Sequence, residues 1–344
     1  MWKCRVGCMK SPCNASALSS TDSSLEYNVK YTGHVAKLGK QHNPPGSFAT
    51  FCCATKPTDV VWTPRSCNLY AWSAQRFCET LGNRTLLLVG DSTMEQLAVT
   101  LMNALHGTAC AKRAQVSYGE SDLLTAVRRT DAGRHERGRS LEWHITRRNP
   151  HLVLFGTGAH FFERMGERPD ASYYNESYYS GSVKHALEVA QKALPGRVIW
   201  KTLSPGGCGA RILDGHMSGE EDWYAQGYSP SSECASRSCW ESRELGRISK
   251  FFPEDDGGGH LRSQFRHYPR MDAIAREHCK RAGVPVLDAS PLYRRVDAHP
   301  GSSPALRNVT DIQRDCLHFC ANPNGPLSLL LVLLHHVLLS MNAS

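Results

Sequence analysis

The chain has 344 residues, of which 41% are hydrophobic and 21% are charged. This composition is typical of a folded globular protein and excludes an intrinsically disordered chain, and the length suits one large α/β domain with an appendage or two smaller domains. The formal net charge of +8 favours anionic neighbours such as acidic polysaccharides, membrane head groups or nucleic acids. Because no Lys/Arg block or recognition-helix motif accompanies that charge, we expect no nucleic-acid partner.

Cysteine is abundant, and glycosylation signals recur along the chain. The sequence holds 14 Cys and five Asn-x-Ser/Thr sites, at Asn14, Asn83, Asn175, Asn308 and Asn342. Together these features predict a disulfide-bearing protein of the secretory pathway. A cytosolic protein with reduced thiols is the alternative, and the cysteine pairing cannot be deduced from the order. Residues 1–20 contain no apolar core, so no N-terminal signal or anchor is visible in this sequence.

The first part of the chain differs in composition from the rest. Residues 1–50 are polar, rich in Ser and Thr and without periodicity, which predicts a poorly ordered linker or stalk. Cys4, Cys8 and Cys13 have a spacing that could suggest zinc, but no nearby His completes a site. Disulfides or free thiols are therefore favoured, and we expect no metal. Residues 51–82 are predicted to form a Cys-rich collar that packs beside the sheet.

A buried strand that ends in Gly90-Asp91-Ser92 dominates the sequence. The apolar run 85–89 predicts the strand, and an amphipathic helix is predicted from Met94 to about His106. Ser92 would then lie at the carboxyl edge of a parallel sheet, where α/β proteins bind ligands, and beside helix N–H groups that suit an oxyanion. The alternative is that Ser92 only caps the helix, since Ser92 and Glu95 fit a capping box.

Apolar runs alternate with helical segments along the rest of the chain. Further strands are predicted at 151–155, 197–202 and 284–288, and further helices at 72–81, 183–194 and 271–282. This alternation predicts an α/β fold with a mainly parallel sheet that helices cover on both faces. The apolar segment 327–339 is short for a membrane span, so a buried terminal helix is favoured over a lipid-anchor signal, and association with a membrane stays open.

Three segments between these elements have open interpretations. The basic region 112–148 predicts a solvated surface, or alternatively a rim for an anionic substrate, and its arginines include Arg128, Arg129, Arg134, Arg137 and Arg139. An aromatic group could stack on sugars, although packing is the commoner role: Tyr173, Tyr174, Tyr178 and Tyr179. The segment 203–259 is a long irregular insert, and inserts of that length are uncommon without a binding or lid role.

A second chemical motif lies near the C-terminus, in Asp315-Cys316-Leu317-His318-Phe319-Cys320. The Asp315 carboxylate can hold one ring N–H of His318, which leaves the other nitrogen to act as a general base for a nucleophile. An incidental ion pair or a zinc site that includes Cys316 and Cys320 is the alternative, although the spacing is too tight for an ordinary zinc finger. Asp297 and His299 form a rival pair that could shape the site instead.

These motifs resemble those of the SGNH/GDSL hydrolase superfamily and, more narrowly, the trichome-birefringence-like or PC-esterase family of glycan O-acetyltransferases and esterases. The similar stretches occur in the family's order over about residues 51 to 340: Trp62 to Leu69, Gly90-Asp91-Ser92, Phe155 to His160, Thr202 to Pro205, Asp297 to Pro300, and Asp315 to Cys320. The resemblance implies a three-layer α/β/α sandwich, with residues 51–344 as the catalytic domain.

The resemblance also implies the roles of individual residues. Ser92 would be the nucleophile, His318 the base and Asp315 its orienter, with an acetyl-serine intermediate. Oxyanion and substrate contacts would come from Ser92, Gly156, Gly158 and His160, and structural support from Gly90, Asp91, Asp297 and His299. Family members usually have Asn where Gly156 stands, so backbone N–H groups of Ser92 and of Gly156 to Gly158 would have to replace that side chain.

The activity so implied is O-acetyl transfer to a polysaccharide or glycan, more than ester hydrolysis, in the Golgi lumen or outside the cell. No cofactor is expected, although acetyl-CoA or an acetylated carrier could serve as co-substrate. Two alternatives remain open. The first is an inert glycan-binding or wall-organising protein, which the missing Asn favours, and the second is a metal-dependent enzyme that uses His and Cys.

Overall fold

The computed structural model of the chain describes residues 2–4, 60–62, 69, 71–125, 139–161, 176–204, 268–289, 292, 317–319 and 326–343. Several predicted features lie outside these residues. They are most of the 1–50 linker, the collar cysteines Cys52, Cys53 and Cys67, the insert from residue 205 onward, Arg128 to Arg137, Tyr173, Tyr174, Asp297, His299, Asp315, Cys316 and Cys320. Within residues 1–50 the structure describes β1 (Trp2–Cys4), which pairs antiparallel with β2 (Val60–Trp62).

Five parallel strands form the central sheet, in the order β4-β3-β5-β6-β7. Their bounds are β3 Leu86–Gly90, β4 Val116–Glu120, β5 Leu152–Gly156, β6 Val198–Lys201 and β7 Val286–Leu287. The last residue of β3, Gly90, pairs with Glu120 on one side and with Gly156 on the other. The carboxyl ends of the three strands are therefore level.

Side chains alternate between two separate cores, one on each face of the sheet. In β3, Leu86 and Leu88 belong to the first core, while Leu87 and Val89 belong to the second. All four are fully buried. A strand buried on both faces has no polar alternation, which explains why β3 reads as a continuous apolar run.

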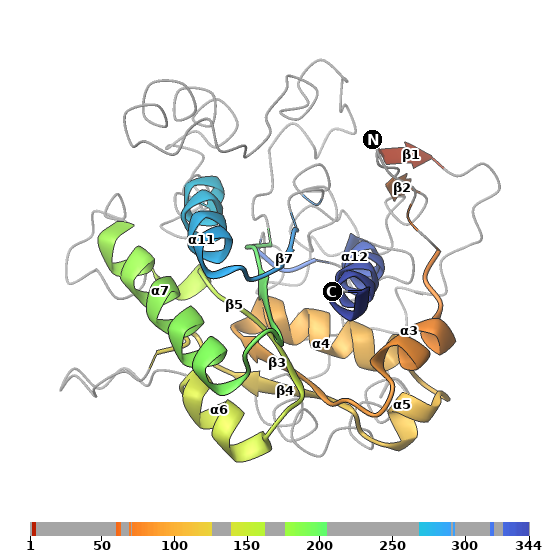
Figure 1. Cartoon of the computed structure of the whole chain (residues 1–344). Coiled ribbons are helices and arrows are strands. Elements are labelled where there is room, and N and C mark those ends of the chain that lie inside the picture. The colour runs from red at the N-terminus through yellow and green to blue at the C-terminus, as the bar shows by residue number, and fades with distance from the viewer. Residues whose placement is uncertain are drawn as a thin grey trace, which may run out of the picture.

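Helices cover both faces, so the described chain has three layers (Figure 1). The first core is covered by α3 (Ala74–Leu81), α4 (Ser92–Ala104), α5 (Ala109–Lys112) and α12 (Pro326–Ala343). The second is covered by α6 (Leu141–Arg148), α7 (Glu176–Ala193) and α11 (Tyr268–Ala282). The predicted α/β class with a parallel sheet and helices is confirmed.

The strand order creates a topological switch point between β3 and β5. From β3 the chain passes through α4 to β4 on one side, and it then returns through α6 to β5 on the opposite side of β3. Connections that leave two adjacent parallel strands in opposite directions open a crevice at their carboxyl ends, where ligands of doubly wound sheets bind. The turn after β3 leads into α4, whose first residue is Ser92, and the segment after β5 comprises residues 157 to 161.

The basic region holds two regular elements that the sequence analysis did not predict. Strand β4 lies at the edge of the sheet, and α6 follows it. The Ser140 hydroxyl caps α6 by accepting from Trp143 N, and Asn149 ends the helix in the left-handed conformation. The arginines in the last turn of α6 lie at the negative end of the helix dipole, which stabilises positive charge. Part of the basic region is therefore helical.

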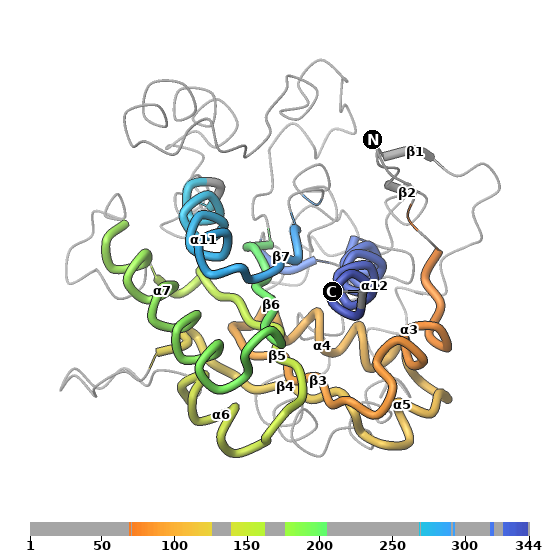
Figure 2. The backbone as a smooth tube through the Cα atoms, in the orientation of Figure 1, coloured from red at the N-terminus to blue at the C-terminus, as the bar shows by residue number. Residues whose placement is uncertain are grey.

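The terminal helix α12 packs against the body of the protein. Its Leu330, Leu334 and Leu338 are fully buried in the first core, and the helix contacts α3, α4 and β7 (Figure 2). Among the described residues, no helix meets the length and hydropathy that a membrane crossing requires. On the same face, Cys78 of α3 and Cys110 of α5 form a disulfide.

Candidate active site

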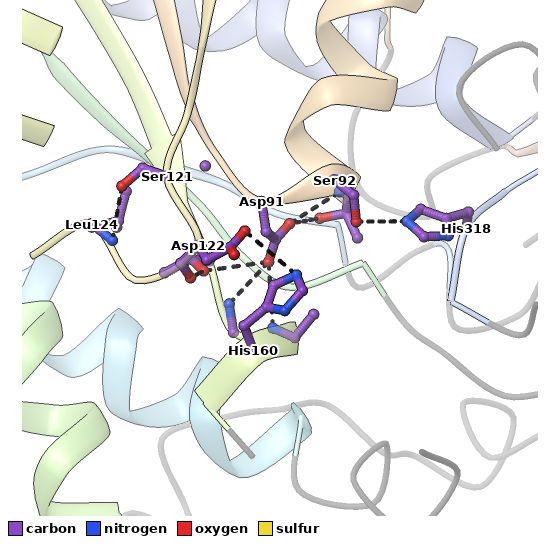
Figure 3. A network of polar contacts seen from close by, with 12 residues as sticks. Asp91, Ser92, Ser121, Asp122, Leu124, His160 and His318 are labelled. Atoms are coloured by element: carbon purple, nitrogen blue, oxygen red, sulfur yellow. Dashed lines mark hydrogen bonds and ion pairs between the residues drawn. The ribbon is translucent and has the colours of Figure 1, made fainter. Parts of the chain in front are cut away.

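Ser92 and His318 meet at the carboxyl edge of the sheet. The Ser92 hydroxyl lies 2.6 Å from the Nε2 atom of His318, although the two residues are 226 positions apart in the sequence (Figure 3). Ser92 is half-buried as the first residue of α4, while His318 is only 9% exposed. A partly accessible hydroxyl that is hydrogen-bonded to an imidazole is the arrangement required of a nucleophile and its base.

Asp91, not Ser92, caps helix α4. One oxygen of its carboxylate accepts hydrogen bonds from Thr93 N at 3.0 Å and from the Thr93 hydroxyl at 2.7 Å. The capping-box interpretation of Ser92 is therefore wrong, because Asp91 occupies the cap position and leaves the Ser92 hydroxyl to His318. As the first helical residue, Ser92 also has an N–H without an acceptor inside the helix.

The second oxygen of Asp91 fastens the turn after β5. Oδ2 lies 3.3 Å from the Thr157 hydroxyl, 3.2 Å from Gly158 N and 3.3 Å from Ala159 N. The N–H of Gly158 was expected to stabilise an oxyanion, but it already donates to this carboxylate. That expectation is corrected: the two turns at the switch point are joined by a buried anion, and Gly158 is part of the joint.

The glycines at the strand ends serve close packing within the protein. A Cβ atom on Gly90 would collide with the carbonyl oxygen of Gly156, and one on Gly156 would collide with the carbonyl oxygen of Lys201. A Cβ on Gly158 would meet the Leu203 side chain in the same way. Gly156 therefore stands where adjacent strands approach too closely for a side chain, which explains the absence of an amide side chain there.

His160 lies near two carboxylates, those of Asp91 and Asp122. Its Nε2 lies 3.5 Å from the Asp122 carboxylate, and it belongs to the short 3-10 helix Ala159–Phe161. Burial raises the pKa of Asp91, but the His160 charge, the Thr93 hydrogen bonds and Lys201 outweigh it, so the pKa of Asp91 is lowered. The structure thus places His160 beside Asp122 and Asp91 (Figure 3), where it stabilises a carboxylate rather than facing Ser92.

Two further buried charged groups, Lys201 and Asp272, interact electrostatically in the same region, and Lys201 also interacts with Asp91. Lys201 ends β6 and donates to the carbonyl of Thr202 and the hydroxyl of Ser204, both at 3.0 Å. Burial lowers the pKa of Lys201 to about 8, although Asp91 and Asp272 both raise it. Burial raises the pKa of Asp272 to about 7, with partial relief from Arg276 and the Leu203 N–H. The Oδ2 atom of Asp272 has no hydrogen-bond partner in the described part of the chain.

Asp272 should make the stability of the protein depend on pH. The pKa of Asp272 in the folded protein is about 7, above the ordinary value of 3.8. Between these two pH values the carboxyl group loses its proton in the unfolded chain but keeps it in the folded protein, so the free energy of unfolding falls as pH rises through this range. Asp272→Asn cannot ionise. We therefore expect its free energy of unfolding, relative to that of the wild type, to increase by about 2–4 kcal/mol as pH rises from 4 to 8. Urea unfolding of both proteins across that range measures the difference, and a difference independent of pH would contradict the assignment.

Several supporting residues were not recognised from the sequence. The Tyr118 hydroxyl of β4 lies 3.0 Å from the carbonyl oxygen of Gly90 and 3.2 Å from that of Asp91, which pins the turn before Ser92. The Gln96 side chain contacts the backbone next to His318. A polar residue four positions after Ser92 in an apolar helix was the available signal for Gln96, whereas Tyr118 gave none, because β4 itself was missed.

The aromatic group is partly structural. Tyr179 is fully buried and packs edge-on against Phe161, with ring centroids 5.0 Å apart. Tyr178 also packs against Phe161, yet it remains 40% exposed.

Within the described ranges, no three His, Cys, Asp or Glu side chains gather as a ligand set for a metal ion.

No protein-family model matches the sequence, and a search of curated proteins finds no match. Two solved structures each align with 76% of this chain. One aligns over 98% of its own chain, at 16% identity and a TM-score of 0.38. The other is LAE5, an alpha/beta hydrolase enzyme from the metagenome of Lake Arreo, Spain, with 95% of its chain covered, 14% identity and a TM-score of 0.36. TM-scores this low do not establish a shared fold.

Proposed function

We propose that this chain is a serine-dependent O-acyl esterase or O-acyltransferase, with Ser92 as nucleophile and His318 as general base. The observation that carries the proposal is the 2.6 Å contact between the Ser92 hydroxyl and the Nε2 atom of His318. Its position supports the proposal too, because the contact lies at the switch point of a parallel sheet and at the N-terminus of α4.

The proposed reaction has two acyl-transfer steps. Ser92 attacks the carbonyl carbon of an ester while His318 takes the hydroxyl proton at Nε2, and the tetrahedral oxyanion collapses as His318 returns that proton to the leaving oxygen. Water or a sugar hydroxyl then attacks the acyl-serine with the same help. Asp315, three residues before His318, is proposed to hold Nδ1–H and so fix the tautomer that leaves Nε2 free.

Stabilisation of the oxyanion is proposed to come chiefly from the start of α4. The Ser92 N–H has no acceptor inside the helix, and the positive end of the helix dipole lies at the same place. Gly158 is excluded from this role because its N–H donates to Asp91. Among the described residues, the turn after β5 therefore contributes fewer backbone donors to an oxyanion than the sequence suggested.

The finer assignment follows the resemblance to the PC-esterase family and its SGNH-type sandwich. On that basis we propose an acetyl group as the acyl unit, a polysaccharide or glycan hydroxyl as acceptor, and acetyl-CoA or an acetylated carrier as donor. The disulfide between Cys78 and Cys110 supports an oxidising compartment, the Golgi lumen or the cell exterior. Cys279 is buried and unpaired, and burial raises the pKa of its thiol to about 12.

Trapping the acyl-enzyme tests this proposal. The protein is mixed with an aryl acetate, quenched in acid and analysed by peptide mass spectrometry, and we expect one acetyl group on Ser92. Faster loss of that group when glycans are added would identify a transferase, whereas loss to water alone would identify an esterase. Absence of acetyl-Ser92 at every quench time would reject both activities.

A glycan-binding protein without catalysis is the second candidate, and one observation favours it. The Gly158 N–H is occupied by Asp91, and Gly156 has no room for a side chain, so the turn after β5 offers fewer donors to an oxyanion. Isothermal titration with glycans separates the two candidates: binding together with no acetyl-Ser92 would support this second function.

A further inference from the structure

Gln96 forms a two-bond clamp on the backbone immediately after His318. Its Nε2 donates to the carbonyl oxygen of Phe319 at 2.7 Å, and its Oε1 accepts from the N–H of Phe319 at 3.0 Å. Gln96 is 1% exposed, and Phe319 is fully buried. The primary amide thus satisfies both polar backbone groups of one buried residue, as a neighbouring strand would do.

The clamp and the nucleophile belong to one helix. Gln96 lies four residues after Ser92 in α4, and residues at that spacing share a helix face. The helix that holds the Ser92 hydroxyl therefore also holds the backbone of Phe319, the residue after His318. Two hydrogen bonds of opposite direction fix the orientation of the Phe319 backbone as well as its distance from the helix.

The residues on either side of His318 are anchored on opposite faces of the sheet. Phe319 lies in the first core with Met94 and Leu97 of α4, whereas Leu317 packs against the second core. Apolar burial of this kind restrains the segment but does not specify its rotation, since apolar contacts are not directional. The amide pairing of Gln96 supplies the missing direction.

We propose that Gln96 is a positioning residue that sets the geometry between the His318 imidazole and the Ser92 hydroxyl. The inference rests on the proposed function, because it assigns Gln96 a role in acyl transfer beyond folding. A displacement of roughly 1 Å at a catalytic pair can lower a rate about 100-fold. Loss of the two Gln96 hydrogen bonds should therefore lower the reactivity of Ser92 strongly, even where the side chain that replaces Gln96 stays buried.

Two substitutions separate positioning from packing. Gln96→Met keeps the length of the side chain and removes both hydrogen bonds. Gln96→Glu is nearly isosteric, and its protonated acid can still donate to the Phe319 carbonyl and accept from the Phe319 N–H. Its carboxylate has no proton to donate and places negative charge against that carbonyl, so the clamp in Gln96→Glu should open as pH rises.

The matched control is a second buried glutamine that also binds backbone. The Nε2 atom of Gln115 donates at 2.8 Å to the carbonyl oxygens of Gly82 and Arg84. Gln115 immediately precedes the amino end of β4, whereas Ser92 follows the carboxyl end of β3. Gln115→Met should lose stability as Gln96→Met does. It leaves the contact between Ser92 and His318 untouched, so its reactivity should equal that of the wild type.

The experiment measures the rate at which a fluorophosphonate labels Ser92 across a range of pH. We expect Gln96→Met to label about 10- to 100-fold more slowly than the wild type at every pH. The rate of Gln96→Glu relative to the wild type should approach one in acid and fall as the new carboxyl group ionises. Equal rates for Gln96→Met, Gln115→Met and the wild type would overturn the inference.

A second readout does not depend on catalysis. Hydrogen exchange of the peptide that contains residues 317 to 319 should accelerate in folded Gln96→Met but not in Gln115→Met, because the Phe319 N–H loses its acceptor only in the former. Unchanged exchange would overturn the clamp by itself. A wild-type protein that takes no label at Ser92 but shows the exchange difference would instead count against the proposed function and leave the clamp as a structural device.

Discussion

Replacing Ser92 with alanine is expected to lower ester turnover by roughly 10⁴- to 10⁶-fold, as removal of a catalytic serine does in serine hydrolases. The reason is geometric, because the substitution removes the hydroxyl that lies 2.6 Å from the Nε2 atom of His318. Steady-state hydrolysis of an aryl acetate measures the effect. The free energy of unfolding should hardly change, since Asp91 and not Ser92 caps the helix.

The chain offers a matched control for this substitution. Ser180 of α7 and His278 of α11 form another serine–histidine contact, with the hydroxyl 2.8 Å from Nε2, but it joins two helices on the face of the sheet opposite to α4. Ser180→Ala should retain full turnover. The double variant Ser92→Ala/His318→Ala should be no slower than Ser92→Ala, because residues that act as one unit are not additive. Turnover that survives Ser92→Ala would contradict the account.

Replacing Asp91 with alanine is expected to destabilise the fold by about 3–5 kcal/mol and to abolish turnover. The carboxylate is fully buried and accepts from the N–H groups of Thr93, Gly158 and Ala159. Without it, these donors lose their acceptor in a region that excludes water, and the turns after β3 and β5 are no longer joined. Urea unfolding measures the change in free energy.

The contribution of Asp91 should also fade in acid. Its folded pKa lies below the ordinary 3.8, so the stabilisation is complete above 3.8 and is lost as pH falls through the folded pKa. The matched control is Ser73→Ala, which removes the N-cap of α3 by deleting a hydroxyl that accepts from Arg76 N and should cost only about 1 kcal/mol. An Asp91→Ala variant no less stable than Ser73→Ala would refute the proposed joint.

The general fold could be predicted from the sequence because its strands are buried on both faces. Residues 86–89 and 152–155 are unbroken apolar runs, and they form most of β3 and β5. Strand β4 was missed, since Val116–Glu120 lies at the sheet edge and ends in Gly-Glu within a basic stretch. Helix α6 was missed because it is short and largely polar, with only Leu141, His144 and Ile145 buried.

The sequence identified two residues that meet at the candidate site, but not the contacts that hold them in place. The Gly-Asp-Ser turn after a strand and the late Asp-x-x-His motif identified Ser92 and His318, which the structure brings together. The roles of Asp91, Gly158 and Gln96 could not be read from the sequence, because they depend on contacts between turns more than 60 residues apart or, for Gln96, more than 200. Asp315, Asp297 and His299 lie outside the described residues, so their roles stay predictions.

Covalent labelling of Ser92 tests the central claim most directly. The protein is treated with a fluorophosphonate, digested and mapped by mass spectrometry, with His318→Ala and Ser180→Ala treated in parallel. We predict a single adduct on Ser92 in the wild type and in Ser180→Ala, and almost none in His318→Ala. An unlabelled wild type, or a Ser92 adduct that forms equally fast without His318, would contradict a nucleophile activated by that imidazole.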